Sequence, residues 1–128
     1  MLADKKLRDR AAYLIAGLYT ALETLRAAAE RGDGAAMLAA YATFKVLHGE
    51  LGQLSAQDIA QAARATHSAR NVGESLRHLL QAARALAGLE PRGGHPLQLY
   101  VTWALGALEA LRSEHGFALG DHPVLPGR

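Results

Sequence analysis

The segment LRDRAAYLIAGLYTALETL, residues 7–25, decides how this chain folds. Apolar side chains recur in it at steps of four or three residues, which places them on one face of an α-helix. This stripe comprises Leu7, Ala11, Leu14, Leu18, Leu22 and Leu25. Because such a stripe must be covered by other apolar surfaces, the segment predicts an amphipathic helix that packs in a bundle.

Capping residues define the two ends of this helix. Asp4 is able to cap its start, and the segment ERGDG, residues 30–34, contains the residues that end it. Gly32 is suited to the position just after a helix, and Asp33 is suited to cap the next one. We therefore expect the first helix near residues 4–31.

Three further helices are expected, near residues 35–54, 56–87 and 97–115. Ser55, in the segment SAQD, is predicted to cap the third helix. The segment LEPRGGHP, residues 89–96, contains two Pro and two Gly and marks a linker. Ala and Leu dominate while Ile and Val are scarce, which favours helix over sheet. The sequence predicts an all-α, single-domain antiparallel bundle over residues 1–115 and an irregular tail over 116–128.

The third helix is expected to be unusually long. At 1.5 Å per residue, residues 56–87 would span about 45–50 Å. Such a helix either extends past its neighbours or bends at Val72-Gly73. Because an overhanging apolar stripe needs a covering surface, a protein partner or a homo-oligomer is expected.

The segment RATHSARNVGESLRHLL, residues 64–80, contributes most of a basic outer face to this helix. The basic positions of that face are Arg64, Arg70, Arg77 and Arg84. One interpretation is a solvated surface with weak intrahelical ion pairs. The other is a ridge about 30 Å long that binds the phosphate backbone of RNA or DNA. Glu74 lies in its centre and no aromatic side chain accompanies it, so such contacts would be only weakly sequence-selective.

The residue inventory disfavours catalysis and metal binding. Cysteine is absent, which excludes disulfides, thiolate ligands and cysteine nucleophiles. No His-x-x-x-His pair and no Gly-rich phosphate loop occurs, and no serine lies in a nucleophile elbow. We therefore expect no catalytic residue, no metal ligand, no cofactor and no small-molecule substrate.

Charge and hydropathy give a weak indication of location. The formal net charge is +2, so only local clustering would produce a strong electrostatic field. No stretch resembles a signal peptide, and the apolar runs are shorter than the ~18 residues of a membrane-spanning helix. A cytoplasmic location without membrane contact is expected. The excess of Arg over Lys indicates a GC-rich, bacterial-like genome.

Two short resemblances to known families bear on function. The segment RNVGESLRH, residues 70–78, resembles the Arg-to-His motif of the helical HEPN ribonucleases, which would imply that Arg70 and His78 act on RNA. Seven residues separate Arg70 from His78 here, whereas that family has four to six. A ribonuclease-like enzyme is therefore the third functional hypothesis.

The second resemblance covers the first half of the chain. The segment LIAGLYTALETLRAAAERGD, residues 14–33, followed by KVLHGELGQL, residues 45–54, is similar to the helical flagellin export chaperones. Those proteins pair a Leu-Tyr on the first helix with a charged Gly-Asp turn. The N-terminal region and the length of the helix before the turn differ from that pattern. This resemblance implies a helical binding module.

Three aromatic residues are candidates for partner contact: Tyr19, Tyr41 and Trp103. Tyr and Trp favour sites where one end of the ring stays in water, so they line either the edge of the core or a partner groove. The leading hypothesis is a non-catalytic binding or adaptor module, or a subunit of a larger macromolecular assembly. The alternative is a small helical subunit that binds nucleic-acid backbone.

Overall fold

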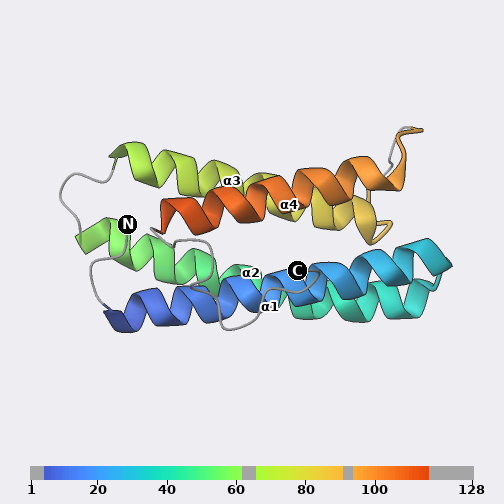
Figure 1. The fold of residues 1–128 in the computed structure, drawn as a ribbon, viewed down its shortest axis with the longest axis horizontal. Coiled ribbons are helices and arrows are strands. Elements are labelled where there is room, and N and C mark those ends of the chain that lie inside the picture. Colours follow the sequence, from blue (N-terminus) through green and yellow to red (C-terminus); the bar gives the residue numbers. More distant parts are fainter. Residues whose placement is uncertain (1–4, 62–65, 91–93, 116–128) are drawn as a thin grey trace.

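Four helices and no strand make up the part of the chain that the computed structural model describes. It describes residues 5–61, 66–90 and 94–115, without the side chains of residues 57–61 and 66–70. The helices are α1 (Lys5–Arg31), α2 (Gly34–Gln61), α3 (Thr66–Leu86) and α4 (Leu97–Glu114). They run antiparallel to one another along the chain (Figure 1), which confirms the predicted all-α antiparallel bundle.

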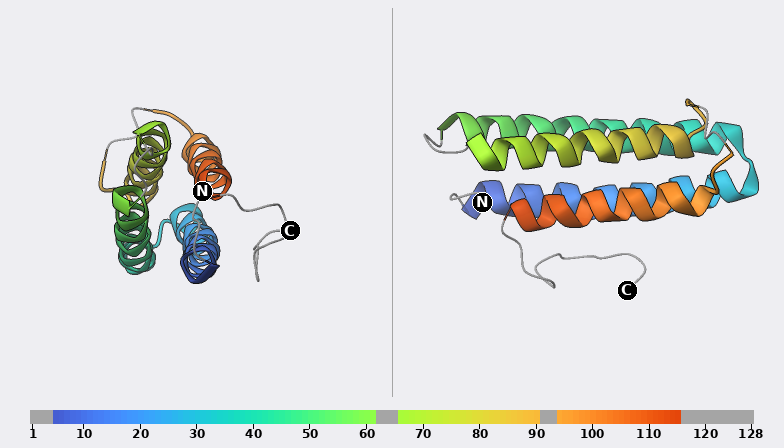
Figure 2. Two further views of the ribbon diagram at one scale, coloured as in Figure 1. Left: turned by 90° about the vertical axis from the view of Figure 1, so that its left-hand side faces the viewer. Right: turned by 90° about the horizontal axis from the view of Figure 1, so that it is seen from above.

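The helices stand at the corners of a square when the bundle is viewed end-on (Figure 2). α1 lies beside α2 and α4, and α3 lies beside the same two helices. α2 and α4 therefore occupy opposite corners, and their backbones do not approach one another within the described residues. The outer faces of α2 and α4 consequently point in different directions.

The core forms around the predicted stripe of α1. Leu14, Leu18 and Leu25 are 1%, 0% and 0% exposed, and Leu7 at the helix start is partly buried. The largest side chains that are fully buried come from all four helices: Phe44, Leu14, Ile15, Leu18, Leu25, Leu51, Leu79, Leu86, Leu108 and Leu111. Each helix thus contributes an apolar stripe to a single core.

The turn between α1 and α2 has the predicted chemistry. Gly32 has a φ of +67°, a conformation that favours glycine, and it directly follows the last residue of α1. The side-chain oxygen Oδ1 of Asp33 accepts a hydrogen bond of 3.1 Å from the amide of Ala36, which caps α2. Gly88, with a φ of +76°, plays the same ending role after α3.

The predicted boundary between the second and third helices was wrong. α2 does not end near residue 54 but continues through Ser55 to Gln61. Ser55 is 3% exposed inside α2, so it does not cap a following helix. The helix continues because residues 55–61 contain good helix formers and because the hydroxyl of Ser55 finds a partner in the core.

The expected length of the third helix was also wrong. α3 has 21 residues, and it runs through Val72 and Gly73 without interruption. α2, with 28 residues, is the longer of the two. A third helix of about thirty residues that extends past the second helix is therefore not found in the described part of the chain, and its length gives no reason to expect a partner.

Two leucines of α4 allow a matched test of the core. Leu108 is 0% exposed and Leu105 is 41% exposed on the same helix. We expect Leu108→Ala to lower the free energy of unfolding by about 2–5 kcal/mol, because it removes buried methyl groups and leaves a cavity. Leu105→Ala should lower the free energy of unfolding by only a small fraction of that amount, because Leu105 is already largely exposed. Urea unfolding followed by circular dichroism measures both, and equal losses would contradict this core.

Candidate binding surfaces

Of the four arginines of the predicted basic ridge, Arg77 and Arg84 have described side chains. Arg64 lies outside the described residues, and so does the side chain of Arg70. Arg77 is exposed, as is the acidic Glu74 one turn before it. The structure therefore shows one exposed arginine beside one exposed carboxylate on this part of α3.

Arg84 is engaged by an acidic neighbour. Its Nε donates a hydrogen bond of 2.8 Å to Oε1 of Glu90, just after α3. This ion pair raises the pKa of Arg84 above its ordinary value. Because the paired carboxylate of Glu90 cancels much of its charge, Arg84 attracts a phosphate less strongly than an unpaired arginine would.

Two of the three aromatic candidates lie in the core. Tyr19 and Tyr41 are 6% and 7% exposed and pack among the buried residues. They do not line a partner groove, because the helix stripes that they widen face inward. Trp103, by contrast, is 41% exposed on α4.

Trp103 belongs to an aromatic cluster, which consists of His78, His95, Tyr100 and Trp103. The Trp103 ring centre lies 6.0 Å from that of His78 on α3 and 6.1 Å from that of Tyr100. His95 meets Tyr100 edge-on at 6.4 Å. These separations lie within the range of favourable ring pairs, so the neighbouring rings orient Trp103, which remains 41% exposed.

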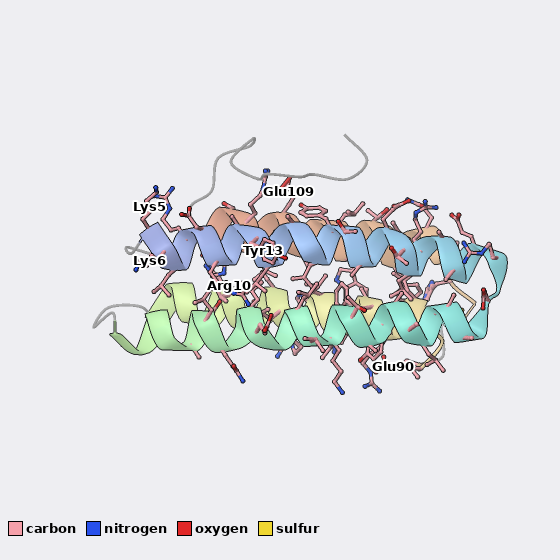
Figure 3. The ribbon with its side chains drawn as sticks, turned by 90° about the horizontal axis from the view of Figure 1, so that it is seen from below. Lys5, Lys6, Arg10, Tyr13, Glu90 and Glu109 are labelled. Atoms are coloured by element: carbon pink, nitrogen blue, oxygen red, sulfur yellow. The ribbon has the colours of Figure 1, made fainter. Side chains whose placement is uncertain are left out.

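A second apolar surface lies between α1 and α2. Tyr13, 60% exposed, sits at this junction (Figure 3). The guanidinium of Arg10 lies 5.7 Å from the centre of its ring and forms an ion pair of 3.3 Å with Glu50 of α2. Tyr13, with Arg10 and Glu50 beside it, lies at one end of a groove that we call the α1–α2 groove.

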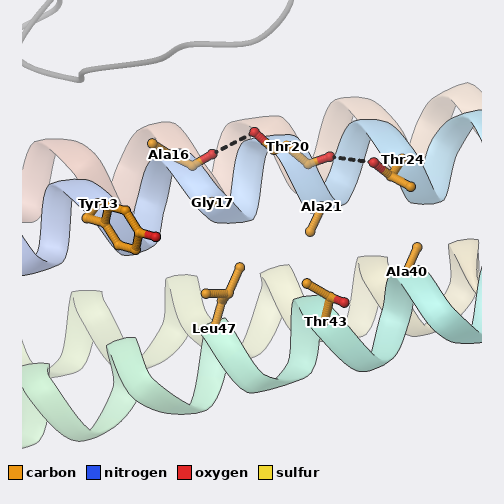
Figure 4. Close-up of a pocket in the computed structure, with 9 residues that line it drawn as sticks. All are labelled: Tyr13, Ala16, Gly17, Thr20, Ala21, Thr24, Ala40, Thr43 and Leu47. Atoms are coloured by element: carbon orange, nitrogen blue, oxygen red, sulfur yellow. Dashed lines mark hydrogen bonds between the residues drawn. The ribbon is translucent and has the colours of Figure 1, made fainter.

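The α1–α2 groove is a hollow of about 450 Å³ with small side chains in its walls (Figure 4). Its lining consists of Tyr13, Ala16, Gly17, Thr20, Ala21, Thr24, Ala40, Thr43 and Leu47. A Cβ atom at Gly17 would lie 3.0 Å from Cδ1 of Leu47, so the glycine lets the two helices approach closely here. None of the lining residues is charged.

The threonines of the groove present methyl groups rather than hydroxyls. The hydroxyl of Thr20 donates to the carbonyl of Ala16 at 3.2 Å, and that of Thr24 donates to the carbonyl of Thr20 at 3.0 Å. Thr43 makes the same kind of bond, at 3.4 Å, to Ala39. Since these hydroxyls are already bonded to the preceding turn, the groove is apolar despite its composition.

A buried polar pair connects α2 to the end of α4. The hydroxyl of Ser55 and Nε2 of His115 share a hydrogen bond of 3.2 Å, and both residues are 3% exposed. Burial lowers the pKa of His115 from 6.5 to about 4. A serine and a histidine enclosed in this way support the structure, because no substrate reaches them. Sequence reasoning missed this pair, since 60 residues separate its members and neither lies in a motif.

The described residues contain no other arrangement that indicates chemistry or membrane insertion. No group of three His, Asp or Glu side chains among them is placed to hold a metal ion. None of the described helices has the length and apolar character needed to span a bilayer. Of the Arg70–His78 motif, the side chain of Arg70 lies outside the described residues, and the ring of His78 lies 6.0 Å from that of Trp103.

Comparison with protein-family models, with curated proteins and with solved structures gave no match.

The basic ridge is tested by reversing its charges. We expect the triple variant R70E/R77E/R84E to bind generic RNA and DNA at low salt as the wild type does. The reason is that Glu90 already engages Arg84 and Glu74 lies within the ridge. Fluorescence anisotropy with labelled oligonucleotides measures this, and a loss of wild-type binding in the variant would establish the nucleic-acid alternative.

The buried histidine predicts a dependence of stability on pH. Below pH 6.5 the unfolded chain binds a proton at His115, whereas the folded chain resists it down to about pH 4. Above pH 6.5 the neutral His115 makes its full contribution to the free energy of unfolding. This contribution is lost as the pH falls to 4, which lowers the free energy of unfolding by on the order of 3 kcal/mol.

The measurement compares the free energy of unfolding of wild type and His115→Gln between pH 7 and pH 4. The difference between the two proteins should change over this interval, because the glutamine does not titrate. His95→Gln replaces an exposed histidine and serves as the control. A constant difference between wild type and His115→Gln would contradict the prediction.

Proposed function

We propose that this chain is a non-catalytic binding module, a subunit or adaptor of a macromolecular assembly, which docks a protein partner through its aromatic cluster. The observation that carries this proposal is the exposed Trp103, held by rings from two helices. Tryptophan is enriched among residues that dominate binding energies, because it offers a large contact area with little conformational freedom to lose.

The surroundings of Trp103 support a protein partner. Leu99 lies one helical turn before Trp103 on the same side of α4 and is 46% exposed. Residues 97–108 contain no charged side chain. Depletion of charge around an aromatic anchor is typical of the centre of a protein interface. Nucleic-acid backbone, by contrast, requires positive charge, which residues 97–108 lack.

The position of the cluster also favours an adaptor. The aromatic cluster lies on α3, on α4 and, at His95, just before α4, whereas the α1–α2 groove lies between the other two helices. A domain with two separate apolar surfaces is able to hold two chains at once. Both surfaces are built mainly on helices, which position side chains more precisely than loops do.

Trp103→Ala tests this function. We expect it to weaken binding of the protein that co-purifies with the chain by on the order of 30-fold or more, as loss of a central aromatic anchor does. Leu105→Ala is the control, since Leu105 is equally exposed on α4 but outside the cluster. Calorimetry with the purified partner measures the effect, after circular dichroism has shown that both variants are folded. Equal affinity of Trp103→Ala and wild type would refute the proposal.

A further inference from the structure

The aromatic cluster has a histidine at each end. Its rings meet in the order His78, Trp103, Tyr100 and His95, with distances between ring centres of 6.0, 6.1 and 6.4 Å. Histidine is the side chain whose charge ordinarily changes between about pH 5 and about pH 8. The docking surface of the proposed function therefore includes two groups that are able to gain a positive charge in mild acid.

His78 is the histidine that contacts the exposed tryptophan itself. Its ring centre lies 6.0 Å from that of Trp103, at an angle of 44° between the ring planes. His78 is partly buried on α3, whereas Trp103 remains largely exposed on α4. A partner that covers Trp103 consequently removes water from the ring of His78 as well.

The ring of His78 is not committed to a hydrogen bond. Two other described histidines are committed, because Nε2 of His48 bonds to the carbonyl of Leu76 and Nε2 of His115 bonds to Ser55. No bond of this kind joins a ring nitrogen of His78 to another part of the chain that the structure describes. The ring of His78 is therefore able to bind a proton without breaking a contact that supports the fold.

The side of α4 that faces His78 has no charge near it. Residues 97–108 of α4 contain no charged side chain. Glu114, further along α4, accepts a hydrogen bond of 3.4 Å from Asn71, which lies about two turns before His78 on α3. No carboxylate of the described part of α4 is thus placed to pair with this ring.

The two nearest charges on α3 itself are exposed. Glu74 lies one turn before His78, and Arg77 directly precedes it. Because Glu74 and Arg77 have opposite signs and lie in water, their combined effect on the ring is weak. A proton on His78 therefore has no buried charge of opposite sign to compensate it within the described residues.

We propose that His78 makes the docking of a partner on Trp103 dependent on pH, an inference that rests on the proposed function. A neutral imidazole is compatible with an apolar docking surface, whereas a charged imidazole loses its water when a partner covers it. Burial of a charge without a compensating charge is unfavourable, so partner binding and protonation of His78 oppose each other. The chain therefore holds its partner at neutral pH and releases it in mild acid.

Fluorescence of the chain alone tests the contact. Trp103 is the single tryptophan of the sequence, so its emission reports on this surface. A charged imidazole quenches a neighbouring indole more strongly than a neutral imidazole does. We expect the emission of wild type to fall from about pH 7.5 to about pH 5.5 and that of His78→Gln to stay constant. His95→Gln is the control that keeps the fall, because His95 contacts Tyr100 instead. A constant emission in wild type or in His95→Gln would overturn the inference.

Calorimetry with the co-purified partner tests the dependence of docking on pH. We expect wild type and His95→Gln to bind several-fold more weakly at pH 5.5 than at pH 7.5, and His78→Gln to lose less affinity. The partner and the buried His115 are the same in all three experiments, so their effects drop out of the comparison. Circular dichroism at both pH values shows whether each protein is folded. Equal losses in wild type and His78→Gln would contradict the proposal, as would tighter binding of wild type in acid.

Two outcomes separate this inference from the proposed function. If Trp103→Ala weakens binding at pH 7.5 but wild type and His78→Gln lose affinity equally in acid, the inference is wrong and the proposed function stands. If Trp103→Ala binds the partner as wild type does, the proposed function is wrong. The inference then fails with it, even where the emission of Trp103 responds to pH.

Discussion

The burial of the apolar stripe of α1 is the interaction on which the rest of the bundle depends. α1 is in contact with each of the other three helices within the described residues. Leu14, Leu18 and Leu25 are almost completely removed from water, and burial of each such side chain stabilises the fold by roughly 1.5–3 kcal/mol. Because α2 and α4 pack on two sides of this helix, they take opposite corners of the bundle.

That placement explains where the candidate surfaces lie. α1 has most of the exposed charged side chains in the first half of the chain, whereas α2 and α4 have long uncharged runs, residues 34–49 with Lys45 alone and residues 97–108 with none. A helix buries only the side that faces the core, so the remaining apolar residues of α2 and α4 face outward. Val46 of α2 and Trp103 of α4 are therefore exposed, on two different sides of the molecule.

Polar contacts between helices determine how the helices align along their length. The pair Ser55–His115 connects α2 to the end of α4, and Nε2 of His48 donates to the carbonyl of Leu76 at 2.7 Å, which connects α2 to α3. Apolar side chains tolerate sliding, but a buried polar group that loses its partner costs about 1–3 kcal/mol. These contacts therefore select one alignment of the helices among several that would bury similar apolar area.

The sequence by itself determined the features that depend on local chemistry. The stripe of residues 7–25, the glycine ends at Gly32 and Gly88 and the cap at Asp33 all follow from helix periodicity and from the hydrogen bonds of neighbouring residues. The tertiary structure alone decided that Ser55 continues a helix, that Tyr19 and Tyr41 are buried, and that Trp103 and the groove beside Tyr13 are exposed. For α2 and α4 the physical reason is that residues 34–49 and 97–108 contain almost no charged side chain, so their sequences do not indicate which side faces inward. Tyr13 and Tyr19 flank the stripe of α1, where helix periodicity alone does not separate the edge of the core from the surface. Only packing against α1 and α3 determines which side is buried, and it leaves the other side exposed.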